Sequence, residues 1–182
     1  MGISEIKEAI RSTVALLSGC NTYWGNQRRP FVNPSNGVTC LLNVSNIETV
    51  GTDDFTYTSN VLTGKLDITQ RANRVISVTV LVEDYMLRED NEAEFIASNV
   101  SEGLTRRQIA EEYLSPHGIT LHEVSDIRAL PTVVVDGHAV VYYACDITFG
   151  ALLEKKSSDA GVIGLDPIGW IDVVEVTDNI TG

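Results

Sequence analysis

Potential metal ligands are scarce in this sequence, and they do not cluster. The 182 residues include three histidines and three cysteines. No histidine stands three or four residues from another histidine or from a cysteine, the spacing that would place two ligands on one helix face. Asp53 and Asp54 are adjacent, but the pattern of a calcium-binding loop does not surround them. Cys40 and Cys145 lie in strand-like runs, which predicts buried free thiols and not activated nucleophiles. We therefore expect no metal and no cofactor.

Motifs of catalysis and membrane insertion are also missing. The sequence contains no phosphate-binding glycine loop and no nucleophile elbow. No apolar run approaches the roughly 18 residues that a membrane-spanning helix needs. Catalytic partners can meet in space without a sequence motif, so a small cytosolic enzyme or ligand-binding protein stays open as an alternative. We favour a protein that is not an enzyme, has no catalytic residues, does not enter a membrane and works through its surfaces.

Basic residues are few. The chain has 13 lysines and arginines against 25 aspartates and glutamates, which gives a formal net charge of −12. A protein that grips nucleic acid through its phosphates needs a basic surface, so the composition argues against that class. The hydrophobic content of 43% is that of a globular protein. At this length the chain predicts one domain over residues 1–182 with a sizeable core.

Apolar and polar residues alternate along two stretches that we expect at the centre of the fold. In residues 75–85 the β-branched side chains recur at every second position, which is typical of a half-buried strand. Residues 139–149 repeat the pattern with aromatic and aliphatic side chains. Together they predict the middle of an antiparallel sheet.

Helical periodicity marks three further segments. In residues 4–18 apolar residues recur at spacings of three and four, with Ser4 as the expected N-cap and Gly19 as the stop. Residues 91–102 show a second apolar stripe, which Gly103 is expected to interrupt. Thr105 and Gln108 form a capping-box pattern for a third helix to about residue 114. The predicted fold class is therefore α+β: a mostly antiparallel β-sheet with an N-terminal helix and a central helical pair packed on it.

The remaining chain is predicted to be strands and connections. We expect strands at 38–50, 119–130 and 170–176, and a hairpin turn at Asp136-Gly137. Residues 20–37 read as irregular, and residues 150–169 read as a flexible loop because they are rich in glycine, serine and aspartate.

A long hairpin arm is predicted at about residues 52–69, between two core strands. Its ends read as extended and its middle as a turn, and long ordered connections are often functional. The arm carries apolar side chains that a solvated loop would not need, which favours contact with another protein chain. The residues expected to make this contact are Asp53, Asp54, Phe55, Tyr57, Leu62 and Leu66.

Four short motifs occur along the chain in a fixed order. A strand leads into Gly51-Thr52-Asp53-Asp54, and the arm ends in Gln70-Arg71 before the valine-rich strand at 75–82. A helical segment then ends at Gly118-Ile119, and residues 143–149 alternate as Tyr-Ala-Cys-Asp-Ile-Thr-Phe. Taken together, this order resembles that of the bacteriophage neck and tail-terminator proteins, over nearly the whole chain.

The resemblance implies a structural virion protein that forms a ring at the head–tail joint, caps the tail tube and connects it to the head. Its partners would be further copies of itself in a hexameric ring, the tail tube protein, the connector or neck proteins and the sheath protein. DNA would pass through the lumen without specific binding. The protein would be assembled in the host cytoplasm and reside in the neck or tail of the virion. A head-completion or connector protein beneath the portal is the alternative within virion proteins.

Overall fold

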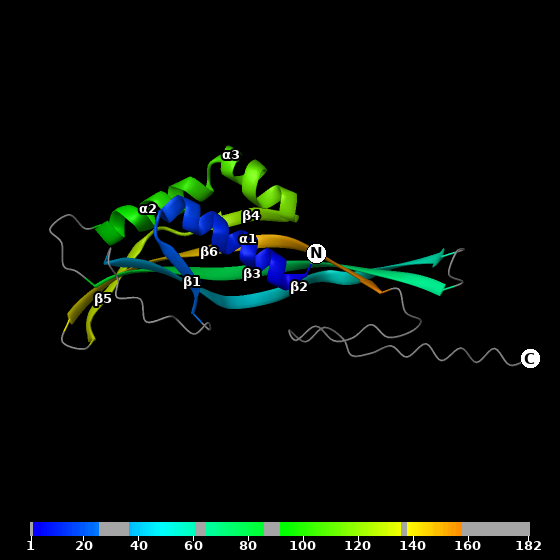
Figure 1. Cartoon of the computed structure of the whole chain (residues 1–182), viewed down its shortest axis with the longest axis horizontal. Coiled ribbons are helices and arrows are strands. Elements are labelled where there is room, and N and C mark those ends of the chain that lie inside the picture. The colour runs from blue at the N-terminus through cyan, green and yellow to red at the C-terminus, as the bar shows by residue number, and fades with distance from the viewer. Residues whose placement is uncertain (1, 26–36, 61–64, 86–91, 136–137, 158–182) are drawn as a thin grey trace, which may run out of the picture.

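The computed structural model of the chain describes residues 2–25, 37–60, 65–85, 92–135 and 138–157. The strands form one six-stranded sheet in the order β1-β2-β3-β6-β4, and β5 also pairs with β6. β1 is parallel to β2, and the other strand pairs are antiparallel. The helices lie across one face of the sheet (Figure 1). The predicted α+β class, with a mostly antiparallel sheet, is confirmed.

The N-terminal helix α1 spans Ile3–Ser18. Its apolar stripe packs on the sheet, and Ile6, Ile10 and Val14 are fully buried there. The helix begins earlier than predicted, because Gly2 and not Ser4 is the N-cap, and the backbone N–H of Gly2 donates to the Glu5 carboxylate at 2.9 Å. Gly19 ends the helix as predicted, with a φ of +66° that favours glycine.

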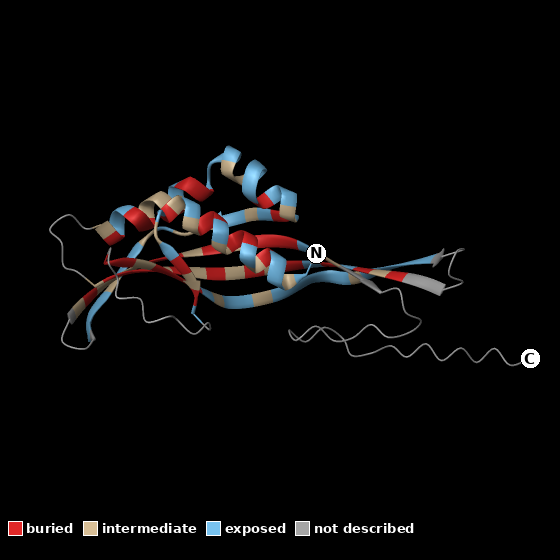
Figure 2. Cartoon of the chain, viewed as in Figure 1, coloured by how far each residue is buried: buried red, intermediate tan, exposed pale blue. Residues whose placement is uncertain are grey.

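Three long strands form the centre of the sheet: β2 (Val38–Asn60), β3 (Lys65–Asp84) and β6 (His138–Ser157). In their register, Val80 of β3 lies opposite Leu42 of β2 and Cys145 of β6. Alternate residues of these strands point at the helices, and Figure 2 shows the resulting alternation of buried and more exposed positions. The central position predicted for 75–85 and 139–149 is confirmed. The β3 residues that form this core face are Ile76, Val78, Val80 and Val82.

The strand β1 (Asn21–Trp24) lies in a stretch predicted to be irregular, and that prediction is wrong for these residues. β1 pairs with the start of β2, Asn21 opposite Thr39. A strand of four residues is too short to show a periodic pattern in the sequence. Its tertiary contacts reveal it instead, since Trp24 is 5% exposed and belongs to the core. Residues 26–36 of the same stretch lie outside the described residues.

The helix α2 spans Glu92–Leu104 and includes Gly103, which was wrongly predicted to interrupt it. Gly103 is buried where α2 meets α1. A Cβ atom at this position would lie 2.5 Å from a methyl carbon of Leu17, so glycine allows the two helices to approach closely. The glycine therefore marks a packing contact and not a helix end.

The second member of the predicted helical pair is a composite segment. It begins as α3 (Arg107–Ile109), widens into the π-helical turn η1 (Ala110–Leu114) and tightens into the 3-10 turn η2 (Ser115–His117). The predicted capping box is not formed: α3 has no side-chain cap, and the Thr105 hydroxyl donates back to the Glu102 carbonyl oxygen at 2.7 Å.

The single strand predicted at 119–130 is two strands, β4 (Ile119–Val124) and β5 (Arg128–Val135). They pair with different stretches of β6, Ile119 opposite Ala151 and Arg128 opposite Ala144. At the far end of β5, Val135 pairs with His138. This agrees with a hairpin, while the predicted turn residues Asp136 and Gly137 lie outside the described residues.

Residues 150–169 were predicted to form a loop. This prediction is wrong for residues 150–157, which form the last part of β6 up to its end at Ser157. Gly150 is buried between neighbouring strands, and beyond it Ala151 and Leu153 are 5% and 3% exposed. The alternation of the strand therefore continues through a glycine that composition alone assigns to a loop. Residues 158–169, and the strand predicted at 170–176, lie outside the described residues.

Candidate interface arm and its junction with the sheet

The predicted arm is an extension of the central strands. β2 and β3 pair from Asp54 opposite Arg71 to Asn60 opposite Lys65, and the arm projects from one end of the molecule (Figure 1). The base of the arm has a third strand that was not predicted, because β6 pairs with β3 as far as Ile68 opposite Ser157. Within the described residues, the part of the arm beyond Ile68 consists of two paired strands, an arrangement that is marginally stable by itself in water.

The two faces of the arm differ in polarity. Phe55 and Tyr57 stand two residues apart in β2, so their side chains share one face. Ile68 lies directly opposite Tyr57 on β3 and is 4% exposed, whereas Phe55 and Tyr57 are 37% and 59% exposed. The alternate positions, which include Thr56 and Thr58, form a polar face. The apolar face lies in register with the core face of β3 and continues it out of the molecule.

A bulge marks the point where the arm leaves the sheet. Val50 lies opposite Asn73 and Asp54 opposite Arg71, so residues 51–53 of β2 face a single residue of β3. Gly51 has a φ of +76° in this bulge, a conformation that costs other residues about 1–2 kcal/mol. The glycine that opens the first family motif is therefore required by the backbone.

The side chain of Asp53 connects the bulge to β3 through an ion pair and hydrogen bonds. Its carboxylate accepts hydrogen bonds from Arg74 Nη1 at 3.1 Å and from Gln70 Nε2 at 2.8 Å. The ion pair is largely removed from water, since the side chains of Arg74 and Asp53 are 6% and 12% exposed. We call Gly51, Asp53, Gln70 and Arg74 the arm junction. Two motifs that are separate in the sequence, Gly-Thr-Asp-Asp and Gln-Arg, thus meet in one structural feature.

The other predicted contact residues are distributed along the arm. Asp54 is exposed, whereas the adjacent Asp53 is partly buried, and Leu66 pairs with Ser59 in the ladder. Leu62 lies outside the described residues. The sequence interpretation missed Arg74, although a signal was present: Gln70 and Arg74 fall on the same face of β3 as the valines of the core and interrupt an otherwise apolar alternation.

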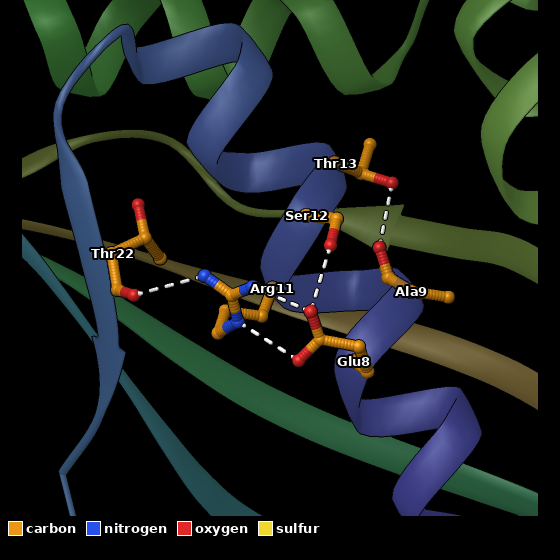
Figure 3. A network of polar contacts seen from close by, with 6 residues as sticks. All are labelled: Glu8, Ala9, Arg11, Ser12, Thr13 and Thr22. Carbon is orange, nitrogen blue, oxygen red and sulfur yellow. Dashed lines mark hydrogen bonds and ion pairs between the residues drawn. The ribbon is translucent and has the colours of Figure 1, made fainter.

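A second polar cluster links α1 to β1. Arg11 Nε donates to the Glu8 carboxylate at 2.9 Å, and its Nη1 reaches the carbonyl oxygen of Thr22 at 3.5 Å (Figure 3). The hydrogen bond from Arg11 is the main reason why the pKa of Glu8 is lowered. Ser12 also donates to Glu8, while Thr13 points away and donates to the carbonyl oxygen of Ala9. This cluster fixes the position of β1 against the helix.

Two thiols approach each other at the end of α1, which the sequence did not indicate. The sulfur atoms of Cys20 and Cys40 lie 3.3 Å apart, and both residues are free cysteines. The contact between the two sulfur atoms is the main reason why the pKa of Cys20 is lowered to about 7 and that of Cys40 is raised. Cys40 and Cys145 are buried as predicted, and burial raises the pKa of Cys145 to about 11.

Other groups of polar residues offer less organised sites. A cleft of about 590 Å³ between α1 and the η1–η2 segment is lined by Glu5, Glu8, Glu112, Tyr113 and His117, among others. Within the described residues, no three histidine, cysteine, aspartate or glutamate side chains gather closely enough to hold a metal ion. None of the helices in the same residues combines the length and apolar character needed to cross a membrane.

Comparison with protein-family models agrees with the predicted resemblance. The sequence model of the phage neck terminator protein family matches residues 4–182. Among curated proteins, no match is found. Among solved structures, the chain is similar to the PVC sheath/tube terminator of an extracellular contractile injection system, determined by cryo-EM in the extended state, with 12% identity and a TM-score of 0.40. That similarity covers 100% of this chain and 66% of the other, so this chain spans slightly less than two thirds of its length. Because the family match extends over nearly every residue, the chain belongs to the phage neck terminator protein family.

Proposed function

We propose that the protein acts as a structural ring at the head–tail joint of a phage, where it caps the tail tube and connects it to the head. The family membership supports a tail-terminating role. The observation that carries the finer proposal is the arm: a projecting strand pair whose apolar face leaves Phe55 and Tyr57 exposed. An exposed apolar surface of this kind commonly marks a protein–protein contact.

The arm is suited to joining neighbouring subunits. If it packs on the next copy, each subunit gives its arm to one neighbour and receives the arm of another. Such a head-to-tail contact is self-limiting when the rotation closes, and it then produces a ring. In this proposal the ring is hexameric, and residues 1–182 work as one terminator domain. The contact residues are Asp54, Phe55, Tyr57, Leu62 and Leu66, while Asp53 holds the arm in position.

The remaining partners in the proposal are the tail tube protein, the connector or neck proteins and the sheath protein. The lumen would let DNA pass without specific binding, since a net charge of −12 per subunit repels phosphates on average. The protein would be assembled in the host cytoplasm, and its role is structural and not catalytic.

The test is a pair of matched double variants. Phe55→Ser with Tyr57→Ser removes the apolar face of the arm. Val133→Ser with Val134→Ser removes two apolar side chains of β5, which are 48% and 70% exposed, at the opposite end of the molecule (Figure 1). All four side chains are at least partly solvated, so we expect both proteins to melt close to the wild-type temperature.

Assembly is then measured by negative-stain electron microscopy, alone and with purified tail tubes. We expect rings or capped tubes from the wild type and the β5 variant, and neither from the arm variant. A folded arm variant that still caps tubes would show that the arm is not the joint. Replacing residues 54–67 by a short Gly/Ser turn is a stronger form of the test, because the pairing of β3 with β6 from Ile68 inward remains.

A further inference from the structure

The thiol pair at the end of α1 has the geometry of a reactive dithiol. Cys20 follows Gly19, the residue that ends α1, and precedes β1, whereas Cys40 lies near the start of β2. Their sulfur atoms are 3.3 Å apart, and a disulfide requires about 2.0 Å. Cys40 is fully buried and Cys20 is half-buried, so Cys20 is the more open of the two residues to a small reagent.

The surroundings hold the two sulfurs together. Thr22 of β1 lies opposite Cys40 in the parallel ladder, and Arg11 of α1 reaches the carbonyl oxygen of the same Thr22 (Figure 3). Cys20 therefore lies between α1, which contacts β1 through Arg11, and β1, which pairs with β2. Cys145 is different, because it lies on β6 and β3 separates that strand from β2.

The two thiols also differ in chemical character. The contact with the Cys40 sulfur lowers the pKa of Cys20 to about 7, which favours the thiolate form of Cys20. The pKa of Cys40 is raised because this thiol keeps the shared proton and is buried. An accessible thiolate beside a protonated, buried thiol is the arrangement of an attacking and a resolving cysteine.

We propose that Cys20 and Cys40 form an intramolecular disulfide with a low-molecular-weight disulfide as the oxidant, Cys20 attacking and Cys40 resolving, so that the end of α1 becomes covalently joined to β2. This proposal does not rest on the proposed function.

The steps balance as a thiol–disulfide exchange. The Cys20 thiolate attacks one sulfur of the reagent, the reagent S–S bond breaks and one small thiolate leaves. Cys40 then loses its proton to that thiolate, and the Cys40 sulfur attacks the Cys20 sulfur of the mixed disulfide. The second small thiolate departs and takes from the solvent the proton that Cys20 had released, so the net reaction converts two protein thiols and one small disulfide into one protein disulfide and two small thiols. In the mixed disulfide Cys20 no longer carries a charge, so the pKa of Cys40 falls and the second step becomes easier.

The bond would act as a clamp. It would connect positions 20 residues apart in the sequence and reduce the freedom of the unfolded chain. For a protein of this size we expect the melting temperature to rise by roughly 5 °C or more. Disulfides persist in oxidising surroundings, virion surfaces included, and are rare in reducing cytosol.

The experiment uses the full-length native protein and oxidised glutathione at about pH 8, above the pKa of Cys20. The protein is then unfolded in denaturant with N-ethylmaleimide present, so that buried free thiols are also blocked, and the cross-links are mapped by mass spectrometry without reduction. We expect one link between the peptides that contain Cys20 and Cys40, with a melting temperature that falls back after reduction. Cys145→Ser is the matched control and should form the same link.

Two variants separate the roles of the thiols. Cys40→Ala should stop at a stable glutathione adduct on Cys20, and Cys20→Ser should show no adduct on Cys40 and no rise in melting temperature. If Cys40→Ala does not fold, the wild type and Cys20→Ser together still decide the outcome. The proposal is overturned if Cys20 and Cys40 are alkylated separately after oxidation, or if Cys20 joins a second copy of the chain instead.

Discussion

Removing the carboxylate of Asp53 should destabilise the protein far more than removing its neighbour. In Asp53→Ala, Arg74 loses the Asp53 carboxylate at 3.1 Å, and Gln70 loses the same acceptor at 2.8 Å. The Arg74 side chain is only 6% exposed, so water cannot easily take the place of the carboxylate. Asp54→Ala is the matched control, because Asp54 is the adjacent carboxylate and is exposed.

The magnitude follows from the burial of the pair. Removing one partner of a buried ion pair typically costs about 3–5 kcal/mol. Arg74 also donates to the backbone carbonyl oxygen of Asn73 at 3.1 Å, and Asp53 retains 12% exposure, so we expect a value near the lower end, about 3 kcal/mol. In a protein of this length that loss lowers the melting temperature by roughly 6–12 °C. The control should change the free energy of unfolding by less than about 0.5 kcal/mol.

Equilibrium unfolding in urea measures both variants against the wild type. A double-mutant cycle with Arg74→Ala then isolates the interaction energy of the pair from the loss of packing. The reasoning is refuted if Asp53→Ala and Asp54→Ala lose equal stability, or if the cycle gives no coupling between Asp53 and Arg74.

Three further predictions concern the bulge, the outer face of the sheet and DNA. Gly51→Ala should lower the free energy of unfolding by about 1–2 kcal/mol because of the positive φ, and Gly51→Asn by less; equal losses in urea unfolding would contradict this. The pKa of Asp146 is lowered by hydrogen bonds from Arg128 and then Thr79, so its contribution to stability is present at neutral pH and is lost as the pH falls below the ordinary value of 3.8 and through the lowered one. Asp146→Asn should therefore be slightly less stable than the wild type at pH 7 and indistinguishable from it in strong acid, as measured by unfolding across pH. With a net charge of −12, the protein should not bind duplex DNA at physiological salt in a fluorescence anisotropy assay, and a salt-sensitive complex would reveal a basic patch.

The elements with a long, regular pattern could be predicted from the sequence. Ile76 to Val82 alternate over a strand that is covered on one face, and Ile6, Ile10 and Val14 repeat along α1 at the helical period. The arm was also predictable, because its extended ends flank a turn-like stretch of the sequence and carry apolar side chains, of which Phe55 and Tyr57 are exposed. The family resemblance could also be recognised from the sequence, because the four short motifs follow one another along the chain in the order typical of the family.

Contacts between distant residues could not be predicted. Gly103 and Gly150 read as breaks, yet the first allows α1 and α2 to approach and the second is buried within β6. A single sequence cannot distinguish a glycine that ends an element from one that makes room for a neighbour. The pairings of Asp53 with Arg74 and of Cys20 with Cys40 join residues that are 21 and 20 positions apart, and only the strand register brings them together.

The ladder between β3 and β6 has an implication for mechanics. It runs without a register shift from Asp84 opposite Val141 in the core to Ile68 opposite Ser157 in the arm. Hydrogen bonds between antiparallel strands are perpendicular to the strands, so a force that pulls on the arm along its length loads many of them at once. Tension applied at the tip would therefore pass directly into the body of the sheet. The arm would resist extension under load and would transmit force rigidly to the rest of the domain.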